Sequence, residues 1–179
     1  MRTSAIAPWF VLIATMLAPV SAHAAVTDAT PQGFTVENTV TVPVAPDVAW
    51  TAMVRDVDRW WPKDHTWWGA ASTLAIEARA GGCFCERAAD NVRQAQHLQV
   101  VHLEPGAALR MTGGLGPLQG MGLHGVLDVT FKAVDGGTSV TWRYRAGGYT
   151  PDDLSKLAPI VDRVQAQQLA GLATHLGEP

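Results

Sequence analysis

Residues 123–146 read LHGVLDVTFKAVDGGTSVTWRYRA, two alternating runs separated by a glycine turn. In the first run, Leu127 and Val129 share one face, while polar residues occupy the other. Trp142 continues this alternation after the DGG turn at 135–137, a sequence typical of a β-hairpin. The stretch therefore predicts a long antiparallel hairpin with one buried face, which a second layer has to cover.

The remaining chain predicts the other strands and that second layer. Alternating or strand-rich segments occupy residues 34–42, 73–78, 83–88, 94–103 and 109–112. Two short helices are expected over 47–55 and 56–61, and an apolar stripe of helical period runs over 159–176. Because strands and helices are segregated, the chain predicts an α+β domain over 34–176, with about six to seven antiparallel strands and a long C-terminal helix.

The N-terminus predicts secretion. Arg2 precedes an apolar run from Ile6 to Val20, and Ala22-His23-Ala24 forms a small-residue cleavage site. We expect residues 1–24 to be a signal peptide cleaved after Ala24, residues 25–33 to be flexible, and the mature protein to be periplasmic or secreted. The alternative is an uncleaved anchor, although the apolar run is short for a membrane span.

Composition excludes several classes of partner. The precursor has 13 Lys and Arg against 16 Asp and Glu, and loss of Arg2 leaves a net charge of −4 with neutral histidines. This mild acidity argues against nucleic acid or an anionic membrane as partner. No second apolar run approaches membrane-spanning length, so we expect no membrane insertion after signal removal.

Six short motifs, in this order, give the chain its resemblance to a known superfamily. They are VPVAP (42–46), WWP (60–62) with His65, GGCFCE (81–86), LGPLQG (115–120), Tyr144 with GGY (147–149), and LAP (157–159) with Asp162 and Gln168-Leu169. Over residues 34–176 the chain resembles the SRPBCC superfamily, the START-like or pollen-allergen-like helix-grip proteins that include polyketide cyclases and dehydrases.

The resemblance implies a curved sheet that grips the C-terminal helix around an apolar cavity. Members of the superfamily bind lipids, sterols, polyketides and other hydrophobic small molecules, and some use the cavity for cyclase or dehydratase chemistry. Others activate a cytosolic chaperone ATPase, a role that does not suit a protein with a signal peptide. A hydrophobic small molecule is therefore the expected partner, and no cofactor is predicted.

Strand alternation and the expected rim loops then indicate which residues would contact that molecule. Inward strand residues, the last helix and the tryptophans near the mouth together form the predicted ligand-binding set. Its members are Trp67, Trp68, Met111, Leu127, Val129, Trp142, Tyr144, Val161, Val164 and Gln168. The glycine-rich loop 113–122 lacks the ending of a phosphate-binding loop and is expected to border the cavity as a lid or hinge.

No catalytic motif is visible, but three residues are candidates for acid–base chemistry. Glu86 shares a strand face with Phe84, so it is a cavity carboxylate if that face is concave and an ordinary surface charge if it is not. His65 lies in the tryptophan-rich loop, and Tyr149 follows the last strand. Either residue could instead bond only to nearby backbone.

Cys83 and Cys85 are the only cysteines and share one face of their predicted strand. A disulfide between them requires a bulge or kink, because bonded cysteines hold their Cβ atoms about 3.8 Å apart. Three interpretations stay open: free structural thiols, a strained and easily reduced disulfide, or a soft-metal site completed by His97 or His102. No metal is assigned.

Overall fold

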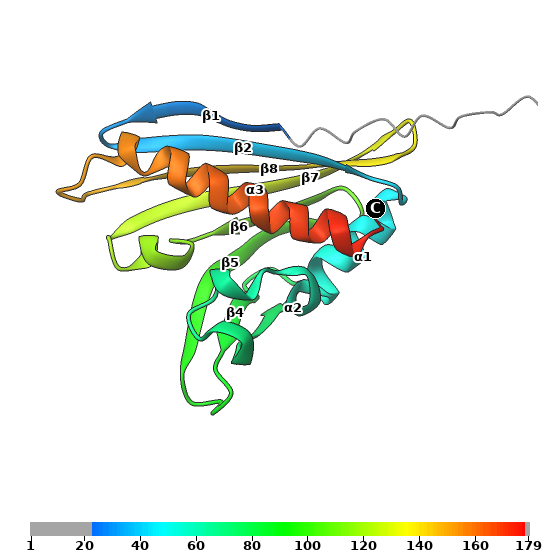
Figure 1. Cartoon of the computed structure of the whole chain (residues 1–179), viewed down its shortest axis with the longest axis horizontal. Helices are drawn as coiled ribbons and strands as arrows, with labels where there is room; N and C mark the ends of the chain where they lie inside the picture. The colour runs from blue at the N-terminus through cyan, green and yellow to red at the C-terminus, as the bar shows by residue number, and fades with distance from the viewer. Residues whose placement is uncertain (1–22, 178–179) are drawn as a thin grey trace, which may run out of the picture.

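The computed structural model describes residues 23–177 and contains one eight-stranded antiparallel sheet (Figure 1). The strands are β1 (His23–Thr30), β2 (Gly33–Val42), β3 (Thr73–Ile76), β4 (Cys83–Arg87), β5 (Gln94–Glu104), β6 (Ala108–Thr112), β7 (Leu123–Val134) and β8 (Gly137–Gly148). Their order across the sheet is β1-β2-β8-β7-β6-β5-β4-β3. The predicted signal peptide lies outside the described residues, except for His23 and Ala24 at the start of β1.

Three α-helices and four 3-10 turns complete the fold. They are α1 (Pro46–Arg55), α2 (Val57–Trp60), η1 (Lys63–His65), η2 (Gly69–Ala71), η3 (Gly116–Gln119), η4 (Leu154–Lys156) and α3 (Ala158–His175). In Figure 1, α3 crosses one face of the sheet, where it packs mainly against β2 and also meets β1 and α2. The predicted α+β helix-grip architecture is thus confirmed, but the sheet has eight strands and not six to seven.

The additional strand is β1. Residues 25–33, predicted as a flexible segment, form most of β1 and the tight turn into β2, with Thr30 opposite Gly33. An edge strand needs only one hydrogen-bonded neighbour, and β1 obtains it from the backbone of β2. Its sequence carries no apolar alternation, so side-chain pattern alone could not reveal it.

Alternation decides which strand residues face α3. In β2 every second residue is buried, including Phe34, Val36 and Asn38, and Asn38 donates a 3.1 Å hydrogen bond from Nδ2 to Asp162 on α3. The register of the predicted hairpin places Leu127 opposite Tyr144 in β7 and β8. The inward face of the sheet is consequently the one that sequence alternation predicts.

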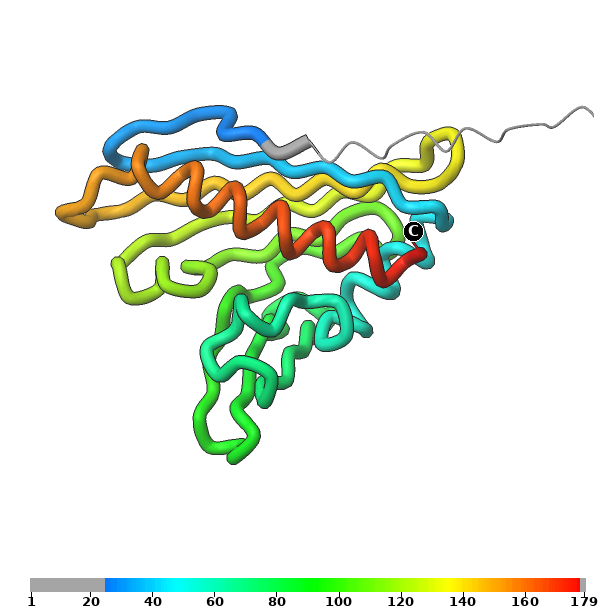
Figure 2. The backbone as a smooth tube through the Cα atoms, in the orientation of Figure 1, coloured from blue at the N-terminus to red at the C-terminus, as the bar shows by residue number. Residues whose placement is uncertain are grey.

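An aromatic cluster fills the interior between the strands and α2. Trp142 on β8 lies 6.2 Å from both Trp60 and Trp61, measured between ring centroids, and Trp61 lies 5.1 Å from Phe84 on β4. This cluster bridges the two parts of the strongly curved sheet, whose β3–β5 region turns away from the other strands in Figure 2. The four aromatic side chains are all buried, so they fill part of the interior of the protein.

Among residues 23–177, no helix has both the length and the apolar character needed to cross a membrane.

Candidate functional site

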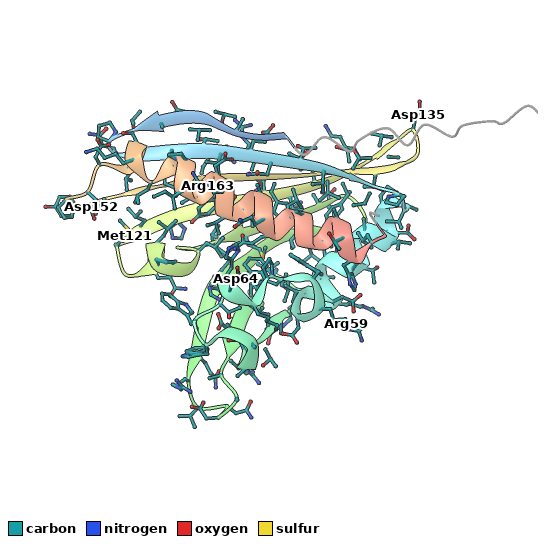
Figure 3. The ribbon with its side chains drawn as sticks, in the orientation of Figure 1. Arg59, Asp64, Met121, Asp135, Asp152 and Arg163 are labelled. Carbon is teal, nitrogen blue, oxygen red and sulfur yellow. A yellow bond between two sulfur atoms is a disulfide. The ribbon has the colours of Figure 1, made fainter. Side chains whose placement is uncertain are left out.

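A cavity of about 380 Å³ lies between three segments of the chain. Its walls come from the N-terminal two-thirds of α3 with Leu157, from the loop that contains η3, and from residues 61–67. Figure 3 labels Met121 and Asp64, which mark the latter two segments beside α3. The volume is within the range of small-molecule sites, which begins at about 300 Å³.

Helical spacing explains the contribution of α3. The residues that line the cavity recur three or four positions apart and so share one helix face. They are Ile160, Val161, Val164, Gln165 and Gln168, preceded by Leu157. The first three are apolar, whereas Gln165 and Gln168 are buried amides with exposed fractions of only 1% and 3%. The helix therefore offers an apolar stretch that ends in two amides.

The loop with η3 forms a second apolar wall, through Leu115, Gly116, Pro117, Leu118 and Met121. Tyr144 fixes its base: the hydroxyl donates to the Gly113 carbonyl at 3.1 Å and accepts from the Leu115 amide at 3.3 Å. Burial raises the pKa of Tyr144 to about 12. Tyr144 therefore contributes to the cavity indirectly, because it holds the backbone of the loop at Gly113 and Leu115.

Residues 61–67 form the third wall, and Glu86 anchors them from behind. The Glu86 side chain has no exposed surface, and its Oε1 accepts hydrogen bonds from the Trp67 amide at 2.8 Å, the Trp68 amide at 3.3 Å and the Ser72 hydroxyl at 2.6 Å. Trp67 itself is 48% exposed, at the rim of the cavity. One strand residue thus ties the rim loop to the sheet.

A β-bulge brings His97 into the cavity wall. Phe84 pairs with Leu98, but Cys85 pairs with Gln96, so His97 is the extra residue in β5. His97 and Leu98 are adjacent and both buried, which regular alternation would not allow. The bulge directs His97 Nε2 to within 2.8 Å of Glu86 Oε2 while the ring also lines the cavity.

The protonation state of His97 follows from these contacts. Burial lowers its pKa from the ordinary value, and the hydrogen bond and charge of Glu86 oppose that shift only in part. The ring is therefore neutral at pH 7. A carboxylate only accepts hydrogen bonds, so Nε2 carries the proton and Nδ1 presents a lone pair.

Several polar atoms in the cavity wall are buried without a hydrogen-bond partner among the described residues. They are His97 Nδ1, His65 Nδ1, both side-chain polar atoms of Gln165, and Gln168 Oε1. Buried polar groups in folded proteins are nearly always hydrogen-bonded. The four side chains in this cavity wall are exceptions to that rule.

The structure brings together part of the predicted ligand-binding set. Trp67, Val161, Val164 and Gln168 line the cavity. Of the others, Trp68 is half-buried beside Arg93, whose guanidinium carbon lies 5.8 Å from the ring centroid. The inward strand residues belong instead to the packed core, each at most 1% exposed, because other buried side chains pack against them. These are Met111, Leu127, Val129, Trp142 and Tyr144.

The three acid–base candidates have three different positions. His65 lines the cavity, and Glu86 faces inward but lies behind His97. Tyr149 is 92% exposed and lies outside the cavity wall, because β8 ends at Gly148 and its side chain extends into solvent. His97 and Gln165 are polar wall residues that were not predicted, although helical spacing from Gln168 could have indicated Gln165.

Cys83 and Cys85 form a disulfide, on the face of β4 opposite Phe84 and Glu86. The register shift beside this pair, between Phe84 and Cys85, places its extra residue in β5 and not in β4. With both sulfur atoms bonded to each other, neither is a thiolate ligand. Within residues 23–177, no group of three or more His, Cys, Asp or Glu side chains is placed to hold a metal ion.

Solved structures with the same fold are numerous. Protein Ms6760 from Mycobacterium smegmatis has a TM-score of 0.58 at 13% identity, over 90% of this chain and 99% of that chain. CalU16 from Micromonospora echinospora has a TM-score of 0.58 at 11% identity, over 88% and 87%. An uncharacterised protein from Rhizobium leguminosarum has a TM-score of 0.56 at 19% identity, over 89% and 98%. At these identities the likeness shows the fold alone.

A search of curated protein sequences found no significant match. The family described as "Polyketide cyclase / dehydrase and lipid transport" matches residues 33–177. This match begins at the first residue of β2 and ends just after α3, so it includes every segment that forms the cavity. The chain therefore belongs to the polyketide cyclase/dehydrase and lipid transport family.

Proposed function

We propose that the protein binds a hydrophobic small molecule in the cavity beside α3. The observation that carries this proposal is a cavity of about 380 Å³ whose apolar wall also holds buried, unpartnered polar atoms. Apolar surface supplies affinity in such sites, and a few polar groups fix the orientation of the ligand. Membership of a family that includes lipid transport proteins supports the same conclusion.

The test uses N-phenyl-1-naphthylamine, a neutral probe that becomes fluorescent in apolar sites. We expect saturable binding by the purified mature protein. Val164→Trp places a large ring in the cavity wall and should weaken binding about tenfold or more, since added volume in a confined site is costly. Gln167→Trp makes the same change on the exposed side of α3 and should leave affinity within about twofold. Absence of binding by the unmodified protein, or equal binding by both variants, would contradict the proposal.

A second candidate function is acid–base catalysis, which the orientation of His97 favours. A cavity-lining histidine that is held by a buried carboxylate, and whose other nitrogen is buried without a partner, resembles a general base in its arrangement. His97 Nδ1 would take a proton from an acidic C–H of a bound carbonyl compound and return a proton from solvent. Incubation with 4-acetylbiphenyl in D₂O measures this as deuterium in the methyl group. We expect exchange above buffer, lost in His97→Phe; equal exchange with and without protein would exclude it for this compound.

The proposed location is the periplasm or the cell exterior, supported by the Arg2, apolar and Ala-His-Ala pattern at the N-terminus. Expression of the full chain in a bacterium with two membranes, followed by fractionation and N-terminal sequencing, tests it. The expected product starts at Ala25 in the periplasmic fraction. A product that retains residues 1–24 would contradict cleavage and favour an N-terminal anchor.

A further inference from the structure

The unpartnered polar atoms of the cavity define the chemistry that a ligand has to supply. Gln165 and Gln168 lie three positions apart on α3, so their amides are neighbours on one helix face. Gln165 lacks partners for both its oxygen and its nitrogen, and Gln168 lacks one for its oxygen. His97 adds an unpartnered Nδ1 from the opposite side, on the β5 bulge. All three side chains are at least nine-tenths buried.

Most of these atoms are hydrogen-bond acceptors. For His97 Nδ1, the contact of the ring with Glu86 determines that it is an acceptor and not a donor. Glu86 Oε1 is occupied by the Trp67, Trp68 and Ser72 donors, so Oε2 remains for the His97 ring. Because a carboxylate has no hydrogen to donate, the His97 proton lies on Nε2 and its Nδ1 accepts. Together with the two glutamine oxygens, this nitrogen requires donors from whatever binds.

The charges around the cavity select against anions. Among the described residues that line it, none is Lys or Arg, and the only acidic side chain is the exposed Asp64. A carboxylate or phosphate placed here would have to give up its hydration without a cation to replace it, at considerable cost. It would also meet the acceptor atoms of His97, Gln165 and Gln168.

Resting on the proposed function, we infer that the ligand is a neutral hydrophobic molecule with one or more hydroxyl groups, whose O–H donates to His97 Nδ1 and the Gln165–Gln168 amides. A hydroxyl can donate to these acceptors and still accept from Gln165 Nε2. A ketone or aldehyde can only accept, and a hydrocarbon can do neither. Fatty acids and phospholipids fall outside this class because of their charge.

Four biphenyls of nearly equal size test the inference at pH 7.5: 4-biphenylmethanol, biphenyl-4-carbaldehyde, 4-methylbiphenyl and biphenyl-4-carboxylate. Each competes with N-phenyl-1-naphthylamine for the purified mature protein. We expect the alcohol to bind about tenfold more tightly than the aldehyde and the hydrocarbon, because a site with buried acceptors discriminates against ligands that leave them unpaired. The carboxylate should bind most weakly.

Glu86→Gln is a variant expected to change His97 Nδ1 from a hydrogen-bond acceptor into a donor. The oxygen of the introduced amide would still accept from Trp67, Trp68 and Ser72, so the amide NH₂ would face His97 Nε2. The proton of His97 would then move to Nδ1, which would become a donor. We expect the ratio of alcohol to aldehyde affinity to fall about tenfold in this variant. Glu104→Gln, an exposed change on the same strand as His97, should leave that ratio unchanged.

The outcomes separate this inference from the function on which it rests. If neither the fluorescent probe nor any biphenyl binds, the proposed function fails. If all four biphenyls bind equally, or the aldehyde or carboxylate binds best, a hydrophobic site exists but the hydroxyl inference is wrong. If Glu86→Gln binds the probe and keeps the alcohol preference of the unmodified protein, His97 is not the acceptor. Circular dichroism establishes that the variant is folded.

Discussion

At the scale of single residues, Glu86 connects several parts of the site through its hydrogen bonds. It is a strand residue without exposed surface that bonds to two backbone amides, a hydroxyl and an imidazole. These partners come from the rim loop 66–72 and from β5, which are distant in sequence. One carboxylate therefore holds the rim of the cavity and sets the proton position on His97.

Replacement of Glu86 by alanine is expected to lower the free energy of unfolding by about 3 kcal/mol, because several buried donors lose their acceptor at once. Urea unfolding measures the change. Glu104→Ala removes an exposed carboxylate from β5 and should change the same free energy by less than about 0.5 kcal/mol. Equal effects of the two substitutions would show that the Glu86 contacts contribute little.

The lowered pKa of His97 predicts that the protein becomes less stable as the pH falls. Its pKa in the folded protein lies below the ordinary value of 6.5, so the unfolded chain takes up the proton first as the pH falls. The unfolding free energy should therefore decrease below about pH 6.5 and stop decreasing, as far as this residue is concerned, below its folded pKa. His97→Gln should flatten this decrease between about pH 7.5 and about pH 5.5.

His124→Gln is the control for that titration, since His124 is exposed on β7. Its pH profile should be that of the unmodified protein. If the unfolding free energy of His97→Gln decreases with falling pH as steeply as that of the unmodified protein, the pH dependence belongs to other groups.

At the scale of elements, the backbones of α3 and α2 approach each other closely at Gly171. A Cβ built at Gly171 would collide with the carbonyl oxygen of Trp60. Glycine in a helix interior normally costs about 1 kcal/mol relative to alanine. Here the close approach of the two backbones outweighs helix propensity, so glycine keeps α2 and its tryptophan against α3.

Gly171→Ala should consequently destabilise the protein by about 1–3 kcal/mol, opposite to the sign that helix propensity predicts. Thermal unfolding with Gly120→Ala as reference tests this, because a Cβ at Gly120 would have its nearest neighbour at an ordinary 3.8 Å. A higher melting temperature for Gly171→Ala would mean that the helices separate without cost.

The comparison of sequence with structure also belongs to the element scale. The inward faces of β2, β7 and β8 could be predicted because alternation records burial directly, as in Leu127 and Trp142. Which inward residues line the cavity could not be predicted, because burial does not distinguish a side chain that borders a cavity from one that packs against another ring. His97 was missed for a further reason: its direction depends on a bulge that only the pairing of β4 with β5 reveals.

At the scale of the whole molecule, the eight-stranded sheet does not depend on its disulfide for its shape. Cys83 and Cys85 enclose one residue within β4, whereas the helix, the aromatic cluster and seven strand pairings connect distant parts of the chain. The stabilisation that a disulfide gives by restricting the unfolded chain is small for so short a loop.

Joint replacement of Cys83 and Cys85 by serine should therefore lower the free energy of unfolding by no more than about 2 kcal/mol. It should leave binding of N-phenyl-1-naphthylamine unchanged, since neither cysteine lines the cavity. Unfolding and probe titration of the double variant measure both quantities. A loss of more than about 4 kcal/mol, or a loss of binding, would show that the bridge supports the cavity region.

The bulge in β5 allows His97 to line the cavity while the rest of the strand keeps its place in the core. Val100 and Leu98 keep the core pattern of β5, while His97 is an inserted residue that pairs with no position on β4. A different side chain at 97 would alter what the cavity recognises without shifting the register of the strands around it. Position 97 is therefore a place where ligand preference can be redesigned without a change of strand register, provided that the new side chain also bonds to Glu86 Oε2.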